Sequence, residues 1–291
     1  MYAKVRDTEI YFDVDGVGLA VTKDGLHEKP VLFAIHGGPG GDHLPFKLAL
    51  QPLTKIAQLV YFDHRGQGRS ARGPRDTYTI ENNIEDMEAL RQHLGLGKII
   101  PFGTSYGGMV AMAYAIRYPQ NISKLILAVT AADYRTFKRA QEILAERGTK
   151  EQCQVAQDVF NGTFKSSEHM KEYFAVLKPL YSRKAALGQL TAPAADFTVW
   201  NHEAANVAFG GFLRTFNLTP RLHEIEAPTL VMGGRHDWIC APEFSEEIAR
   251  LIPNSQLKIF ENSAHSLRLD EPELMLATIE AFIGGPKTCP I

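Results

Sequence analysis

The chain has 291 residues, of which 45% are hydrophobic and 22% are charged, and its formal net charge is −2 at pH 7. This length allows one large α/β domain with an insertion, or two modest domains, and the balanced charge gives no indication of nucleic-acid binding. No segment resembles a signal peptide or approaches the ~20 apolar residues of a membrane span. The three cysteines lie far apart, which argues against a disulfide framework or a zinc site. We therefore expect a cytoplasmic protein.

Strand-like and helix-like segments alternate in the first half of the chain. Residues 2–22 are predicted to form two antiparallel strands around the turn dipeptide Asp15-Gly16. Two continuous apolar runs follow, VLFAI from residue 31 and LVYF from residue 59, as expected of buried parallel strands. An amphipathic helix is predicted between Thr79, a suitable N-cap, and Gly95, which would end it. This alternation favours a doubly wound, mostly parallel sheet.

The stretch IIPFGTSYGGMVAMAYAIRY at 99–118 joins an apolar strand to a helix through the pattern G-x-S-x-G. The turn is so tight that Ser105 should have a positive φ, and a side chain at Gly103 or Gly107 would collide with neighbouring backbone. The serine hydroxyl would then lie at a helix N-terminus, where unpaired N–H groups favour a developing oxyanion. The alternative is a glycine-rich turn with a passive serine.

Residues 134–224 differ from the rest, because they contain several helix-like segments and no comparable strand. The strand–helix alternation resumes at 225, with strands TLVMGG and QLKIF and helices near 242–251 and 272–283. We therefore predict that 1–133 and 225–291 form one sheet domain, and that 134–224 is a helical cap inserted into it.

Two polar residues follow the last two predicted strands. Asp237 comes after LVMGG and His265 after LKIF, so both should lie at the carboxyl edge of the sheet near Ser105. A serine hydroxyl needs a base, and the base needs an orienting carboxylate. We assign Ser105 as nucleophile, His265 as general base and acid, and Asp237 as the orienting group. Three other carboxylates lie near the histidine in sequence: Glu261, Asp270 and Glu271.

The oxyanion of such a reaction should be bound by the N–H of Tyr106 and by an N–H of the loop HGGPG, most simply that of Gly38. In the loop DHRGQGRS, Asp63 and Arg65 are interpreted as bracing the loop, and His36 and His64 as structural. No motif for a metal or a nucleotide is present, so no cofactor is predicted.

The segments HGGPG, FDHRGQGRS, GTSYGG, GGRHD and SAHS together resemble the proline iminopeptidase family of α/β-hydrolases. The resemblance covers roughly 30–133 and 225–285. It implies a helical cap over the site, no cofactor, and cleavage of an amide bond after an N-terminal residue, often proline. It matches Ser105, Asp237 and His265 to a catalytic triad. It matches Gly38 and Tyr106 to the oxyanion donors.

The chain departs from this family where peptidases hold the substrate's ammonium with cap glutamates, and sometimes with a glutamate beside the triad aspartate. Here Trp238 follows Asp237, and Asn206 falls where a cap glutamate would align. Glu203 is the nearest acidic candidate for binding the ammonium. The alternative interpretation of Glu203 is a solvated helix residue without a substrate contact. If free amines are not required, Asn206, Trp238 and Phe209 are predicted to line a pocket for a neutral acyl group.

Three functions follow from these residues. The first is a serine hydrolase that cleaves a small amide or ester, in its sharpest form an aminopeptidase of proline iminopeptidase type. The second is a carboxylesterase or lactonase that acts on neutral acyl substrates. The third is a non-catalytic receptor on the same fold. The predicted partner is a small molecule or short peptide, and neither nucleic acid nor membrane is expected.

Overall fold

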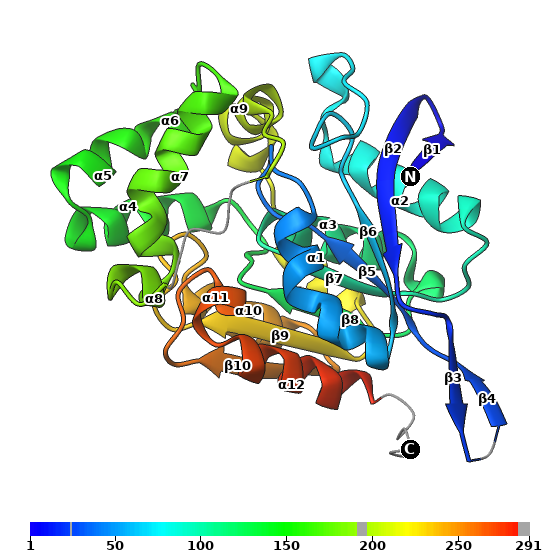
Figure 1. The fold of residues 1–291 in the computed structure, drawn as a ribbon. Helices are drawn as coiled ribbons and strands as arrows, with labels where there is room; N and C mark the ends of the chain where they lie inside the picture. Colours follow the sequence, from blue (N-terminus) through cyan, green and yellow to red (C-terminus); the bar gives the residue numbers. More distant parts are fainter. Residues whose placement is uncertain (24, 191–196, 285–291) are drawn as a thin grey trace.

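A computed structural model of the chain describes residues 1–23, 25–190 and 197–284. Its centre is an eight-stranded sheet with the order β1-β2-β6-β5-β7-β8-β9-β10, in which all neighbours from β6 to β10 are parallel and β1 and β2 are antiparallel (Figure 1). The strands are β1 Tyr2–Val5, β2 Thr8–Asp15, β5 Val31–Ile35, β6 Gln58–Phe62, β7 Ile100–Thr104, β8 Leu125–Ala128, β9 Thr229–Gly234 and β10 Ser255–Phe260. This is the doubly wound, mostly parallel sheet that the sequence predicts.

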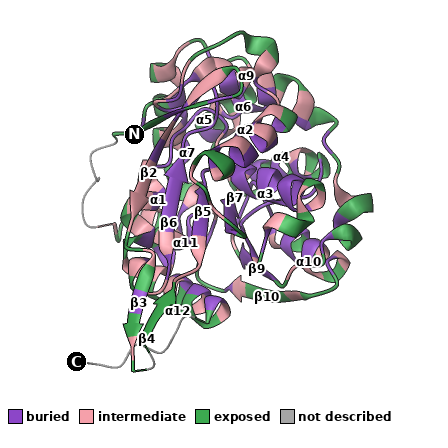
Figure 2. Ribbon diagram, turned by 90° about the vertical axis from the view of Figure 1, so that its right-hand side faces the viewer, coloured by how far each residue is buried: buried purple, intermediate pink, exposed green. Residues whose placement is uncertain are grey.

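The central strands are buried on both faces, which is why they read as continuous apolar runs (Figure 2). In β5, Phe33 and Ile35 belong to one hydrophobic core, and Leu32 and Ala34 to the other. Alternate residues of a strand point to opposite faces, so each face needs its own layer of helices.

Helices cover both faces of the sheet. One layer contributes α2 Ile80–His93, α3 Tyr106–Arg117 and α10 Pro242–Leu251, and the other contributes α1 Leu44–Leu50, η1 Gln51–Lys55, α11 Leu267–Asp270 and α12 Pro272–Ile283. The predicted capping of α2 is confirmed, since the Thr79 hydroxyl accepts a hydrogen bond from the N–H of Asn82 at 3.2 Å, and Gly95 follows the helix with φ +65°. Short 3-10 turns complete the core: η2 Arg75–Thr77 and η3 Pro119–Asn121.

Between β8 and β9 the chain leaves the sheet and forms a group of helices beside it, which we call the helical insertion (Figure 1, green to yellow). Its elements are α4 Arg135–Arg147, α5 Lys150–Val155, α6 Gln157–Asn161, α7 Ser167–Tyr181, α8 Arg183–Ala186, α9 His202–Gly210, η4 Phe212–Arg214 and η5 Thr219–Glu224. Within the described residues of the predicted cap 134–224 no strand is formed, although a single bridge pairs Asp133 with Asn217.

The predicted pairing of strands around Asp15-Gly16 is wrong. The antiparallel partner of β2 is β1, across a tight turn at Arg6-Asp7, and the opposite edge of β2 pairs with β6. The first half of β2, Thr8–Tyr11, pairs with β1, and the second half, Phe12–Asp15, pairs with β6 and not with the chain that follows Gly16. That chain forms a separate hairpin, β3 Leu19–Thr22 with β4 Gly25–Glu28.

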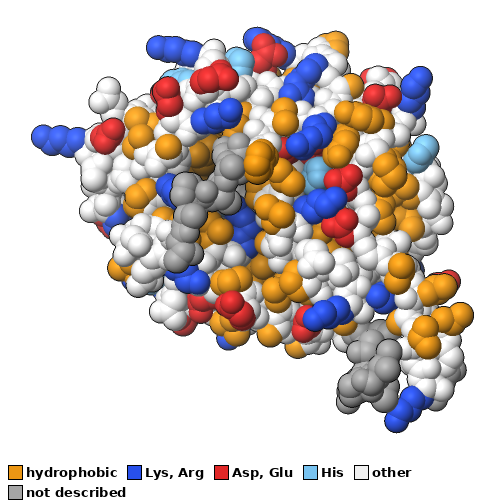
Figure 3. Space-filling model, in the orientation of Figure 1, with side chains coloured by type: hydrophobic (Ala, Val, Ile, Leu, Met, Phe, Trp, Pro, Cys, Tyr) orange, Lys and Arg blue, Asp and Glu red, His pale blue; other side chains and the backbone are white. Residues whose placement is uncertain are grey.

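The β3–β4 hairpin projects from the body of the molecule (Figure 1). It carries apolar side chains that are largely exposed, and these are visible on its surface in Figure 3. They are Leu19, Val21 and Leu26, together with Val17 just before the hairpin.

Candidate active site

Ser105 occupies a strained turn between β7 and α3. Its φ and ψ are +53° and −122°, which confirms the positive φ expected of this position. A Cβ added to Gly103 would lie 2.2 Å from the carbonyl oxygen of Gly107, and one added to Gly107 would lie 2.1 Å from that of Ile35. The two glycines are therefore required by close backbone approach, as predicted from the sequence.

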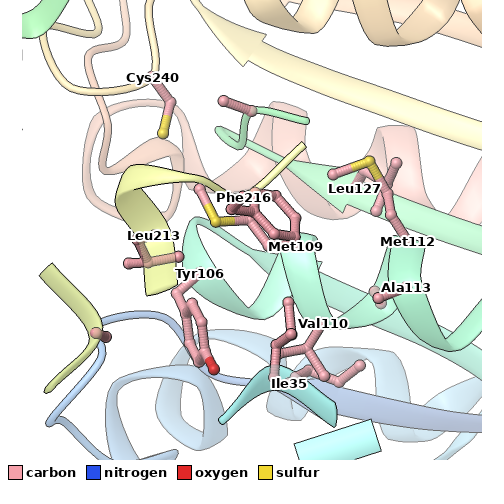
Figure 4. Packing of buried hydrophobic residues seen from close by; sticks show 14 of the residues in the cluster. Ile35, Tyr106, Met109, Val110, Met112, Ala113, Leu127, Leu213, Phe216 and Cys240 are labelled. Atoms are coloured by element: carbon pink, nitrogen blue, oxygen red, sulfur yellow. The ribbon is translucent and has the colours of Figure 1, made fainter. Parts of the chain in front are cut away.

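The turn is held by hydrogen bonds from the neighbouring strand. The N–H of Ser105 donates to the carbonyl of Ala128 at 2.9 Å, and the hydroxyl of Thr130 donates to the carbonyl of Ser105 at 2.7 Å. Helix α3, which follows, is buried along most of its length, and Figure 4 shows its residues packed beside Leu213 and Phe216 of the helical insertion. Ser105 thus sits on a rigid support.

Asp237 and His265 lie at the ends of β9 and β10 and form a hydrogen-bonded pair. The distance from His265 Nδ1 to Asp237 Oδ2 is 2.7 Å, and the Asp237 side chain is fully buried. Asp237 Oδ1 accepts two further bonds, from the N–H groups of Ile239 at 2.9 Å and Cys240 at 3.0 Å. Because an ionised carboxylate only accepts, the proton at this contact belongs to Nδ1, and Nε2 keeps its lone pair.

The other carboxylates near His265 in sequence bind elsewhere. Glu261 pairs with Arg235 at 2.9 Å, and Glu271 accepts from the hydroxyl of Ser263 at 2.7 Å. Asp270 accepts from the N–H of Ala264 at 2.9 Å and does not contact the imidazole. Among the described carboxylates, Asp237 is therefore the partner of His265.

Ser105 and His265 lie at the same edge of the sheet without a hydrogen bond between them within 3.5 Å. His265 lines a cavity of about 20 Å³ together with Thr104, which precedes the serine, and Val129, which follows β8. The His265 side chain is 11% exposed. Catalytic hydrogen bonds are often long in unliganded enzymes and shorten when substrate is bound, so this arrangement is compatible with catalysis.

The loop after β5 lies against the serine. A Cβ at Gly37 would be 3.1 Å from the Cβ of Ser105. The backbone N–H of His64 donates to His36 Nε2 at 3.2 Å, so the His36 proton is on Nδ1, which donates to the Gly37 carbonyl at 2.8 Å. Burial lowers the pKa of His36, which favours the neutral ring that this pattern needs.

The peptide after Gly37 is oriented by this bond. Because its carbonyl points to His36, the N–H of Gly38 in the same peptide plane points away from His36. Within the described part of the chain, neither this N–H nor that of Tyr106 donates to another group. Both of the predicted oxyanion donors are therefore available.

The loop DHRGQGRS braces the site, as its sequence indicates. Buried Asp63 accepts from His43 Nδ1 at 2.7 Å and from the N–H of Arg69 at 2.8 Å. Arg65 forms two bonds with Asp86, at 2.6 and 2.7 Å. In the same loop, Gln67 Oε1 accepts from the N–H of Gly40 at 2.7 Å, and this bond ties DHRGQGRS to the glycine-rich loop HGGPG.

Two of the predicted substrate-binding side chains are engaged with other groups. Glu203, in the first turn of α9, forms an ion pair with Arg75 at the surface, and its side chain is 36% exposed. The hydrogen bond from Arg75 lowers the pKa of Glu203. The Asn206 side chain accepts from the N–H of Phe164 at 2.9 Å and donates to the carbonyl of the same residue at 2.8 Å.

The two predicted aromatic lining residues differ in their surroundings. Trp238 is 1% exposed, and its ring packs edge-on against Tyr181 at 5.6 Å and Phe160 at 6.4 Å. The Tyr181 ring in turn lies 5.5 Å from that of His265. Phe209 is half-buried and packs edge-on against Phe137 at 6.0 Å. Sequence reasoning missed Tyr181, because a tyrosine at the end of an amphipathic helix gives no signal of its own.

Within residues 1–23, 25–190 and 197–284, no group of three or more His, Cys, Asp or Glu side chains could hold a metal ion. None of the helices in this part has the length and apolar character needed to cross a membrane. Cys153 and Cys240 are free thiols, and Cys289 lies outside the described residues.

Comparison with known proteins agrees with the fold and the motifs. The sequence profile of the α/β hydrolase fold matches residues 30–272. A hydrolase from Pseudomonas aeruginosa PA01 superposes with a TM-score of 0.75 over 98% of both chains at 23% identity. An esterase from Thermogutta terrifontis superposes with a TM-score of 0.67 over 98% of both chains at 26% identity. These matches define the class: an α/β-hydrolase fold with a mostly parallel sheet.

The sequence relatives narrow the class. The proline iminopeptidase PfmaB of Pestalotiopsis fici is 31% identical over 279 residues, which cover 94% of this chain and 98% of that protein. The chain therefore belongs to the α/β-hydrolases and, among them, to the proline iminopeptidase family, as its motifs suggest.

Proposed function

We propose that the protein is a serine hydrolase in which Ser105, His265 and Asp237 form the catalytic triad. The single observation that carries this proposal is the 2.7 Å bond between His265 Nδ1 and Asp237 Oδ2, formed at the strand edge that also presents Ser105 in a strained turn. A passive serine would need neither the strain nor the paired histidine.

In the proposed reaction, Ser105 Oγ attacks the substrate carbonyl while His265 Nε2 takes its proton. The N–H groups of Gly38 and Tyr106 then stabilise the oxyanion, and His265 returns the proton to the leaving group. Water hydrolyses the acyl-enzyme by the same steps. Asp237 stabilises the imidazolium throughout, and no cofactor is needed.

The proposed substrate is a short peptide or a related small amide with a free N-terminal residue, in keeping with the proline iminopeptidase relatives. Such a substrate brings an ammonium group under the helical insertion. We propose that the insertion, residues 134–224, acts as a cap over the site. A buried charge without a partner costs several kcal/mol, so a carboxylate should bind it. Glu203 is the proposed partner. To bind the ammonium, its carboxylate would have to release Arg75.

A second candidate is an esterase or lactonase for neutral acyl groups. It is favoured by the present engagement of Glu203 with Arg75 and of Asn206 with the backbone of Phe164. Near the base the uncharged rings of Trp238 and Tyr181 are packed together instead. Such uncharged surroundings would favour an apolar acyl group over an ammonium.

Two measurements on one preparation test these functions. A fluorophosphonate probe should label wild-type protein at Ser105, and a failure to react would exclude both enzymes and leave the non-catalytic receptor. Prolyl and alanyl anilides, their N-acetylated forms and short acyl esters should then be compared by kcat/KM. A preference for free-amine anilides supports the aminopeptidase. Equal cleavage of the free and acetylated forms would exclude it in favour of the esterase.

A further inference from the structure

The residues on both sides of His265 are bonded to the same part of the helical insertion. The N–H of Ser266 donates directly to the carbonyl of Tyr181 at 2.9 Å. The N–H of Ala264 donates to Asp270 Oδ2 at 2.9 Å, and Asp270 in turn bonds to residues 182–184. We call residues 181–184, where α7 ends and α8 begins, the α7–α8 junction.

Asp270 joins the junction to the histidine loop through one carboxylate. Its Oδ1 accepts from the Ser182 hydroxyl at 2.6 Å and from the N–H of Lys184 at 3.0 Å. Its Oδ2 accepts from the N–H of Arg183 at 3.0 Å, in addition to the N–H of Ala264. Three of the four donors thus come from the insertion, and only one comes from the loop that carries His265.

This carboxylate is buried, with 4% of the residue exposed. A buried charge depends on its hydrogen bonds, so Asp270 cannot lose the junction without a large cost. If the junction moved, Asp270 would either move with it or accept hydrogen bonds from water in place of the junction donors. In either case the bond that fixes Ala264, directly before His265, would change.

The imidazole itself also contacts the junction. The Tyr181 ring lies edge-on to the His265 ring, with 5.5 Å between centroids and 76° between planes. The junction therefore touches the base in three ways: by the Tyr181 ring, by the Tyr181 carbonyl through Ser266, and by Asp270 through Ala264.

We infer that the α7–α8 junction positions the catalytic base, with Asp270 as the residue that transmits the position of the insertion to His265. This inference rests on the proposed function, since it takes His265 as the base. Asp270 is a positioning residue and touches no reacting atom. The bonds of the junction hold His265 in line with Asp237, and they are already formed in this structure. The hydrogen bond from Ser105 would then form to an imidazole that the junction has fixed in place.

Three variants of the full chain separate this role from a merely structural one. Ser182→Ala removes a hydroxyl that reaches the core through Asp270, and Asp270→Asn places an NH₂ group against N–H donors. Glu271→Gln is the matched control, because Glu271 braces the same loop through Ser263 and the N–H of Asn262 without contact to the insertion. Each variant is compared with wild type by kcat and KM, by the rate of fluorophosphonate labelling, and by the proton NMR resonance of His265 Nδ1–H.

We expect Asp270→Asn to lower kcat and the labelling rate by about 100-fold, because a misplacement near 1 Å has effects of that size. The Ser182 hydroxyl donates to Asp270 and also accepts from the N–H of Ala185 as the N-cap of α8, and only the first of these bonds reaches the histidine loop. Ser182→Ala should lower both rates by about 5-fold, the equivalent of that one bond, with KM within about 2-fold. The Nδ1–H resonance should shift or broaden in both variants. Glu271→Gln should resemble wild type in all three measurements.

The inference would be overturned if Ser182→Ala behaved as wild type, or if Glu271→Gln slowed labelling as much as Asp270→Asn. Should Asp270→Asn fail to fold, Ser182→Ala decides the question alone. A wild-type protein that does not react with the probe would overturn the proposed function instead. Even then the His265 resonance in Ser182→Ala reports whether the junction positions the imidazole.

Discussion

At the scale of single residues, the hydroxyl of Ser105 is the group on which the proposed chemistry depends. Ser105→Ala should lower kcat by several orders of magnitude, since triad members act as a unit and such losses reach about 10⁶-fold. The side chain makes no hydrogen bond that caps α3, so the fold should be retained. Turnover of the best substrate and the circular dichroism spectrum test both points. More than about 1% residual turnover would contradict the assignment of the nucleophile.

Asp237→Asn should act through the imidazole tautomer. Two N–H donors face Oδ1, so the amide oxygen of an asparagine must take that place and its NH₂ group must face His265 Nδ1. Nδ1 would then accept, the proton would move to Nε2, and kcat should fall by about 10⁴-fold. Glu261→Gln, which alters an exposed pair with Arg235 in the neighbouring loop, is the control and should retain activity.

Glu203→Gln tests the ammonium site. If free-amine substrates are preferred, the variant should lose about 2 kcal/mol of that preference, because a neutral amide replaces a charged partner. The measurement is the ratio of kcat/KM for a free-amine anilide to that of its N-acetylated form, with neutral esters as the control. An unchanged ratio in an enzyme that does prefer free amines would limit Glu203 to its ion pair with Arg75.

The residues with roles that follow from local chain geometry, or from the ends of predicted strands as for Asp237 and His265, could be predicted. Those fixed by other distant partners could not. The positive φ of Ser105 follows from five consecutive residues, G-T-S-Y-G. The pairing of Glu203 with Arg75 joins positions 128 apart, and the bond from Ser182 to Asp270 joins positions 88 apart. No sequence pattern indicates such pairs, because a polar side chain that has a distant partner looks the same in the sequence as one on a solvated surface.

At the scale of elements, the β7–α3 turn depends on its glycines. Gly103→Ala should destabilise the protein by several kcal/mol, because its Cβ would overlap the backbone of Gly107. Gly97→Ala is the matched control, since a Cβ there meets nothing within 4 Å, and it should be neutral or slightly stabilising. Urea unfolding measures both. Equal stability of the two variants would mean that the turn can open without cost.

Elements that bury one face were predicted well, because burial imposes a period on the sequence. The final helix, expected at 272–283, is α12 Pro272–Ile283, and the helix near 242–251 is α10 Pro242–Leu251. The N-terminal pairing failed because the partner of a strand can lie far away in the sequence. The half of β2 next to Asp15-Gly16 pairs with β6, which begins more than 40 residues after β2 ends.

At the scale of the whole molecule, acid should weaken the fold through Glu88. This buried residue of α2 accepts from Arg91, Tyr114 and Asn121, and so ties α2 to α3 and η3. Burial alone would raise the pKa of Glu88, but the hydrogen bonds from Arg91, Tyr114 and Gln92 lower it from 4.5 to about 2. The unfolded chain therefore takes up the proton first as pH falls. The resulting stabilisation is complete above about pH 4.5 and is lost as pH falls towards 2.

The variant Glu88→Gln measures this effect. At pH 7 it should be less stable than wild type, by at most about 3 kcal/mol given the size of the pKa shift. The difference should narrow as pH falls from about 4.5 towards 2, because protonated wild type resembles the variant. Urea unfolding at several pH values gives the free energies, with Glu85→Gln in the same helix as the control. A difference that stays constant down to pH 3 would contradict the mechanism.

The parallel pairing of β8 with β9 closes the sheet across the whole helical insertion, a span of roughly 100 residues. The entropy of closing a loop grows only with the logarithm of its length, so even a doubling of this span costs about 0.6 kcal/mol. The insertion can accordingly be lengthened, shortened or exchanged for a foreign one at little cost to the sheet. A replacement would still have to supply the donors that the α7–α8 junction now gives to Asp270. In evolution and in chimera design alike, the freedom to change what lies over the site would then be limited at this one carboxylate.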